Sequence, residues 1–184
     1  MLKIWKIDKF FLLVFILLVI GCAKQEEKKA EPGLEIKIKT TEKIRFAYLK
    51  NLGPYWEMAP LFAQVGKYAM EKGITGELMG IYYDDPAVVP AGSLRSEIGI
   101  SVPEDYEPEP PFQARELLPQ QVAFAVLKGP YDQIAEKYGE IMKWIEENGY
   151  MVVGPPREIY LKGGEEIPES EYLTEVQFPI AKGY

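Results

Sequence analysis

Alternating apolar and polar positions predict one strand early in each half of the chain. In residues 46–50, Phe46 and Tyr48 alternate with smaller apolar side chains, and residues 122–127 alternate in the same way. Side chains of a strand point to opposite faces with a period of two, so we expect both segments to be strands. A Gly-Pro-Tyr triplet follows each strand and marks a turn.

Apolar residues with helical spacing follow both turns. They are Met58, Phe62, Val65 and Ala69 in the first half, and Ile134, Tyr138, Ile141 and Ile145 in the second. This spacing predicts a second helix over residues 131–148, and Gly73 and Gly149 are expected to end the two helices. Proline inside a helix costs about 3 kcal/mol, so Pro60 predicts that the first helix begins near Ala59.

Further alternating segments complete the predicted sheet. They are residues 78–83, 96–102, 157–161 and 173–180, with leading segments at 34–38 and 112–117. A proline-rich, acidic stretch at 103–111 is expected to be an extended linker. The predicted class is α+β, with an antiparallel sheet and two long helices built from two strand-helix-strand-strand modules, about 34–102 and 112–180.

The two modules align with each other, which indicates an internal duplication. Residues 46–73 match residues 122–149 without a gap, and residues 81–102 match residues 159–180. Two copies are too few for a solenoid, which needs at least about three repeats. We therefore expect a pseudo-symmetric pair within one domain, residues 34–184.

The N-terminus has the pattern of an export signal. Three lysines precede an apolar run at residues 10–20 that ends in Gly21 and Cys22. The run is shorter than the roughly 20 residues of a spanning helix, which is the weaker interpretation. Residues 19–22 resemble the bacterial lipobox, so we expect a signal peptide at 1–21, a lipid on Cys22 and a solvated tether at 22–33.

Composition supports that interpretation of Cys22 over an incidental small apolar residue. Cys22 is the only cysteine among 184 residues, so the domain after it has no disulfide. Loss of residues 1–21 would change the formal net charge from −7 to −9, and an acidic domain is a poor nucleic-acid binder. The expected location is the cell envelope, with the domain lipid-anchored on the extracytoplasmic side and with no nucleic-acid partner.

Taken in order, the motifs resemble the GyrI-like small-molecule-binding domain, also known as the AraC-type effector-binding domain. A strand ends in Gly-Pro-Tyr, a helix ends in Gly, Ile-Tyr follows, and the last strand reads Glu-Val-Gln-Phe-Pro-Ile. The resemblance covers residues 34–180. It implies a cleft for hydrophobic, often cationic molecules, with a glutamate of the last strand, here Glu175, as counter-charge. The competing interpretation is that Glu175 is a solvated residue opposite an apolar face.

Other candidates for ligand binding are aromatic residues and the pseudo-symmetric partner of Glu175. They are Trp56, Tyr48, Tyr82, Tyr160 and Glu97. Core packing is the competing account for the aromatic residues, because aromatic side chains in strands are more often core than ligand platform. Tyr55 and Tyr131 are expected to fix the turns. Asp84 and Asp85 precede a proline and are expected to form a solvated turn instead of a metal site.

These observations leave three hypotheses for function. The leading one is a membrane-anchored lipoprotein that binds an amphipathic, possibly cationic small molecule, without a cofactor. The chain has no histidine, which excludes most nucleophile and base pairs, but a hydrolase of electrophilic molecules could use Glu175 with Tyr82. The third is a degenerate domain that acts as a protein interaction module, which an exposed apolar patch would favour. A direct role in transcription is not expected, since only a signal and a tether precede the domain.

Overall fold

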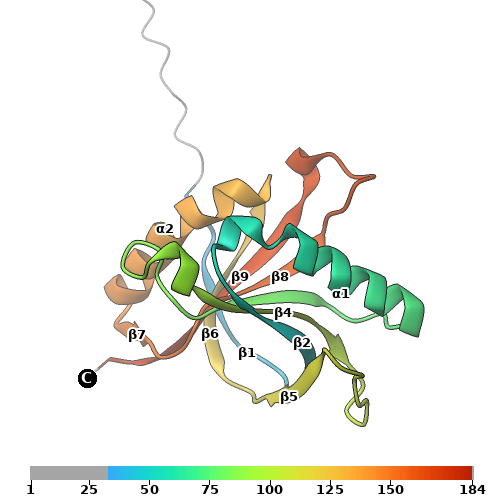
Figure 1. Ribbon diagram of the computed structural model, residues 1–184. Coiled ribbons are helices and arrows are strands. Elements are labelled where there is room, and N and C mark those ends of the chain that lie inside the picture. Colours follow the sequence, from blue (N-terminus) through green and yellow to red (C-terminus); the bar gives the residue numbers. More distant parts are fainter. Residues whose placement is uncertain (1–32, 184) are drawn as a thin grey trace, which may run out of the picture. The chain divides into compact units, whose positions relative to one another are not determined.

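The computed structural model describes residues 33–183, which form an antiparallel sheet with two helices (Figure 1). The predicted α+β class is confirmed. The first half contains β1 (Lys37–Thr40), β2 (Ile44–Leu52), α1 (Ala59–Lys72), β3 (Leu78–Tyr82) and β4 (Arg95–Val102). The second half contains β5 (Gln113–Leu117), β6 (Gln121–Lys128), α2 (Ile134–Glu147), β7 (Tyr150–Val152), β8 (Arg157–Lys162) and β9 (Leu173–Lys182). The predicted signal peptide, Cys22 and all of the tether before Gly33 lie outside the described residues.

The helices begin and end where local chemistry allows. α1 begins at Ala59, as predicted, and Pro60 lies in its first turn, where its missing N–H has no intrahelical partner to lose. α2 begins later than predicted because Tyr131–Gln133 forms a 3-10 turn first. Gly73 and Gly149 follow the helices with φ of 66° and 73°, a conformation that favours glycine. The short strand β7 was not predicted.

The strand order is β1-β6-β9-β8-β3-β4-β2-β5, and β7 pairs with β9. The order is pseudo-symmetric about the central pair, β8 and β3, which comes from equivalent positions of the two modules. The leading strands are exchanged between modules. β1 is the leading strand of the first module but pairs with β6 of the second, and β5, the leading strand of the second module, pairs with β2 of the first. Each module therefore completes the sheet of the other.

Both helices pack on one face of the sheet, which we call the helix face (Figure 1). Ile141 and Ile145 of α2 pack with Phe178 of β9, and Val65 of α1 packs in the cluster that contains Ile98 of β4. Strand alternation sends the intervening side chains to the opposite face. They form a third buried cluster there, made of Phe46, Tyr48, Met79, Ile81, Leu117 and Ile159.

Close packing of β2 on β4 requires glycine at position 99. A Cβ there would lie 2.1 Å from the backbone oxygen of Ala47, whereas a Cβ at Gly139 of α2 would meet nothing within 4 Å. We expect Gly99→Ala to lower the free energy of unfolding by about 1–3 kcal/mol through strand displacement. Gly139→Ala, the control, should raise it by roughly 0.5–1 kcal/mol, since alanine favours a helix. Urea denaturation measures both, and an unchanged Gly99→Ala variant would contradict the packing argument.

Candidate functional site

A buried glutamate, Glu158, lies on the helix face of the central strand β8. Its residue is 9% exposed. The hydroxyl of Tyr160 donates a hydrogen bond of 2.7 Å to Glu158 Oε2, and that of Tyr82 donates one of 3.2 Å to the same oxygen. The hydroxyl of Tyr138 donates a bond of 2.8 Å to Oε1. The hydroxyls of Tyr82 and Tyr160 are themselves 2.7 Å apart.

The pairing of the two central strands brings these groups together. Glu158 lies directly opposite Gly80 of β3 in the antiparallel register. Tyr160 follows two residues after Glu158 and shares its face, as Tyr82 does with Gly80. A Cβ at Gly80 would lie 2.9 Å from the Tyr82 hydroxyl, so the missing side chain leaves the space in which the Tyr82 ring lies. The pseudo-symmetric positions 80 and 158 therefore hold one carboxylate between them.

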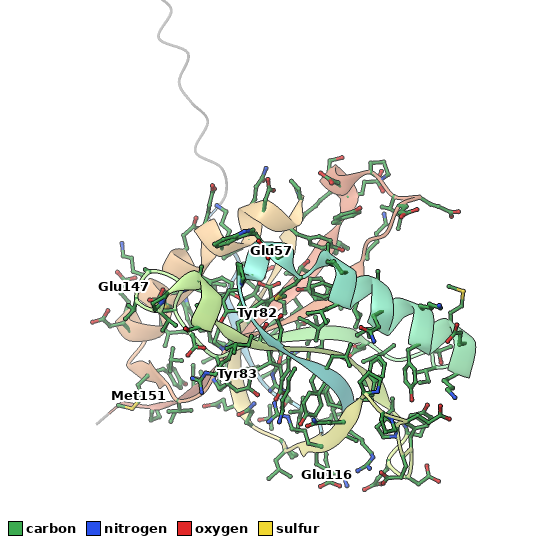
Figure 2. All side chains as sticks on the ribbon, in the orientation of Figure 1. Glu57, Tyr82, Tyr83, Glu116, Glu147 and Met151 are labelled. Atoms are coloured by element: carbon green, nitrogen blue, oxygen red, sulfur yellow. The ribbon has the colours of Figure 1, made fainter. Side chains whose placement is uncertain are left out.

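Three tyrosines contact Glu158 and three further aromatic residues pack on two of those tyrosine rings; we call the six the aromatic cluster. They are Tyr55, Phe62 and Tyr82 from the first module, and Tyr131, Tyr138 and Tyr160 from the second. The rings of Tyr55 and Tyr82 meet edge to face at 5.0 Å, and those of Tyr131 and Tyr160 do so at 5.3 Å. Tyr131 is exposed, so the cluster extends from Glu158 to the protein surface. Tyr82, which Figure 2 labels, belongs to the cluster.

The electrostatics of Glu158 are those of a carboxylate without a cation. Burial raises its pKa, and the hydrogen bonds from the three tyrosine hydroxyls oppose that rise in part. Burial and the neighbouring Glu158 also hold the pKa of Tyr82 and Tyr138 well above the usual value. No lysine or arginine among residues 33–183 pairs with Glu158. The site combines a desolvated carboxyl group with aromatic rings.

The structure places Glu175 and Glu97 on the opposite face of the sheet, in two equivalent ion pairs. Lys39 of β1 lies 2.5 Å from Glu175 of β9, and Arg115 of β5 lies 2.6 Å from Glu97 of β4. Both cations also lie over aromatic rings, those of Phe124 and Tyr48. Each pair joins an exchanged leading strand to the last strand of the other module, so the two glutamates hold the modules together.

The remaining predicted residues are divided between several places. Tyr82 and Tyr160 lie beside Glu158, whereas Tyr48 lies on the opposite face and belongs to the buried cluster there. Trp56 lies in a 3-10 turn and is 72% exposed. Tyr55 reaches Tyr82 and also binds the turn, because its hydroxyl donates to the backbone oxygen of Asp84 at 3.0 Å.

Glu158 was not among the residues predicted from the sequence, although the sequence contains a signal for it. The aligned segments begin at positions 81 and 159, one residue after Gly80 and Glu158. Strand alternation places Glu158 and Tyr160 on the same face, and Ile159 on the other. Glu158 and Gly80 occupy equivalent positions directly before the repeated Ile-Tyr. This difference between the two modules was the signal for the site.

The acidic pair after β3 forms a turn. Asp84 accepts hydrogen bonds from the side chain of Arg95, and Asp85 accepts one from the backbone of Ala87. Within residues 33–183, no group of three or more acidic, histidine or cysteine side chains is arranged to hold a metal ion. The helices in the same part of the chain are too short or too polar to cross a membrane.

The family model for the GyrI-like small molecule binding domain matches residues 34–181. The chain belongs to this family. The match spans both modules, so the pseudo-symmetric sheet and the aromatic cluster lie within the GyrI-like domain. Small-molecule binding is therefore the general activity that this domain supports.

Proteins similar to this GyrI-like chain differ in what their names state. A DNA gyrase inhibitor of Erwinia billingiae is 29% identical over 155 residues, which cover 81% of this chain and 99% of the inhibitor. The EcmrR C-terminal domain matches with a TM-score of 0.70 and 22% identity, over 81% of this chain and 98% of that domain. SAV2435 bound to tetraphenylphosphonium matches with a TM-score of 0.52 and 12% identity, over 80% of this chain and 94% of SAV2435. The two structural matches show the shared fold.

The ion pairs on the opposite face should be energetically coupled. Glu97 is buried, so loss of either partner leaves an uncompensated charge. We expect a double-mutant cycle of Glu97→Gln and Arg115→Met to give a coupling of about 1 kcal/mol or more in the free energy of unfolding. The exposed pair Lys67 and Glu71 of α1 is the control, with an expected coupling below about 0.5 kcal/mol. Equal coupling in both cycles would contradict a joining role.

Glu158 should make stability depend on pH. Its raised pKa means that the folded protein holds the proton more tightly than the unfolded chain, whose carboxyl titrates near 4.5. The free energy of unfolding should therefore fall as pH rises from about 4.5 to the folded pKa, and Glu158 should contribute no slope outside that window. Chemical denaturation of wild type and Glu158→Gln across pH isolates this slope as their difference. A difference that is constant with pH would contradict the raised pKa.

Proposed function

We propose that this protein binds an amphipathic organic cation at Glu158, with the aromatic cluster as the wall of the site. One observation supports this most directly. Glu158 is a buried carboxylate that has three hydroxyl donors and no cationic partner among residues 33–183. A cationic ligand would supply the missing charge, and the rings would contact its apolar surface.

The energetics favour a hydrophobic cation over a small hydrated one. Attraction between a cation and a ring face amounts to about 0.5–1 kcal/mol at exposed sites and to about 2 or more where water is excluded. The same exclusion of water strengthens the Coulomb attraction to Glu158. A compact ammonium ion would lose strong hydration on entry, whereas a cation covered by aromatic or aliphatic groups loses little. Tyr131 is exposed at the outer side of the cluster, so the ligand would enter past this ring.

The comparisons support the same ligand class. Tetraphenylphosphonium, named with SAV2435, is a hydrophobic cation without hydrogen-bond donors. We propose no nucleic-acid partner. The whole sequence has a formal net charge of −7, and an acidic protein is repelled by nucleic-acid phosphates. The structure of an EcmrR-DNA complex has a similar fold, but DNA binding is not carried over from it to this protein.

The proposed setting is the extracytoplasmic side of a membrane, with Cys22 as the lipid anchor. This part of the proposal is supported by the sequence of residues 1–33 alone: lysines, an apolar run of signal length, the lipobox-like Val-Ile-Gly-Cys and a charged tether. A binding domain tethered there would meet amphipathic molecules as they leave or enter the membrane surface.

Tetraphenylphosphonium titration of the purified protein by calorimetry tests the site. We expect Glu158→Gln to weaken binding about 10-fold or more, equivalent to about 1.4 kcal/mol, because the countercharge is lost while the shape is kept. Glu175→Gln is the matched control and should bind like wild type, since Glu175 is paired with Lys39 on the opposite face. The affinity of wild type should also rise with pH through the raised pKa of Glu158, as the carboxyl ionises.

Two outcomes would contradict the assignment. Retained binding in Glu158→Gln with loss in Glu175→Gln would give the countercharge role to Glu175, as the family resemblance first implied. Absence of binding by the wild type to tetraphenylphosphonium and to quaternary ammonium ions with aromatic groups would remove the cationic ligand class. Thermal unfolding of each variant shows whether a loss of binding reflects a loss of folding.

Hydrolysis of an electrophilic small molecule is the second candidate function, with Glu158 in place of Glu175. A carboxyl group with a raised pKa, 2.7 Å from a tyrosine hydroxyl, has the proximity needed for general acid-base work. Turnover of an activated ester or a strained electrophile that is lost in both Glu158→Gln and Tyr160→Phe would support it. Tight binding without turnover would favour the binding protein.

A further inference from the structure

A buried arginine, Arg157, lies one residue before Glu158 and therefore on the opposite face of β8. Its residue is 2% exposed. Neither Nε nor Nη2 of its guanidinium has a hydrogen-bond partner among residues 33–183, and the salt bridges of that part of the chain do not include Arg157. A buried guanidinium without such partners is costly, which makes Arg157 the least compensated charge on this face.

The other buried charges near Arg157 already have partners. Glu175 is held by Lys39 and by a hydrogen bond from Gln177, and Glu97 is held by Arg115. The two carboxylates are therefore already paired with Lys39 and Arg115. Arg157 adds a third positive charge that has no carboxylate of its own. Burial lowers the pKa of Arg157, and the positive charge of Arg115 lowers it further. The negative charge of Glu175 opposes both effects in part.

The unpartnered donors form a definite shape. Nε–H and one N–H of Nη2 point in parallel from one edge of the guanidinium plane, and this edge receives a carboxylate through two hydrogen bonds. Gln177 is the direct neighbour of Arg157 on β9. Arg115 contributes a further unpartnered donor, its own Nε. The face therefore offers unpartnered donors and one excess positive charge, beside one unpartnered acceptor, Gln177 Oε1.

We propose that Arg157 anchors a second binding site, for the carboxylate of a small organic acid, on the face of the sheet opposite the aromatic cluster. The monovalent charge of a carboxylate matches the one uncompensated cation. The side chains of Lys39 and Arg115 on the same face are 38% and 37% exposed, so the ligand would enter past them. The equivalent position in the first module is Met79, which is fully buried, so the duplication supplies one such site and not two.

Thermal unfolding of the full chain in acetate tests this site, with chloride at equal ionic strength as reference. A ligand that binds only the folded state raises the melting temperature as its concentration rises. We expect this rise in wild type and its loss in Arg157→Met, which introduces the residue found at the equivalent position. Arg95→Met is the matched control. Arg95 is exposed and paired with Asp84, so this variant should keep the acetate response.

A second measurement does not depend on the stability of a variant. The Nε–H signal of Arg157 in a nitrogen-proton NMR spectrum, assigned by its absence in Arg157→Met, should shift progressively as acetate is added to wild type. The acetate response should persist in Glu158→Gln, because that site lies on the other face. The same melting temperature in acetate and chloride, an acetate response retained by Arg157→Met, or an unmoved Nε–H signal would each overturn the proposal.

Discussion

The antiparallel pairing of β3 with β8 joins the two modules into one sheet and sets the position of Glu158. This pair lies at the centre of the sheet and joins two modules that arose from one sequence pattern. Glycine on one strand opposite glutamate on the other gives the centre a single carboxylate. Two glutamates there would repel each other in a desolvated place, and two glycines would leave the tyrosine hydroxyls without an acceptor. The two modules are therefore nearly symmetric in their strands but differ at the site, where one supplies glycine and the other glutamate.

The exchanged leading strands explain why a duplicated chain forms one domain. β1 and β5 each complete the other module, and their cations, Lys39 and Arg115, reach carboxylates of that same module. The ion pairs, the cation-π contacts and the buried apolar cluster share one face. The helices and the aromatic cluster occupy the other. One face therefore mainly joins the modules, and the other holds a carboxylate ready for a ligand.

Most of the fold could be predicted from the sequence because it depends on local pattern and repetition. Alternation predicted the main strands, and Pro60 together with the terminal glycines predicted the helix ends. The site could be predicted only in part. Tyr82 and Tyr160 follow from the repeated Ile-Tyr, but Glu158 is absent from the repeat, since its counterpart is Gly80. Periodicity alone could not show that Glu175 meets Lys39, because that contact depends on strand exchange between modules.

The ionisation of Glu158 itself tests most directly whether this carboxyl group binds a cation. Carbon NMR of the labelled carboxyl group, assigned through Glu158→Gln, gives its pKa with and without tetraphenylphosphonium. We expect a pKa above the ordinary glutamate value in the free protein, because burial outweighs the tyrosine hydrogen bonds, and a decrease when the cation binds. An ordinary pKa that the cation leaves unchanged would contradict a cation site at Glu158.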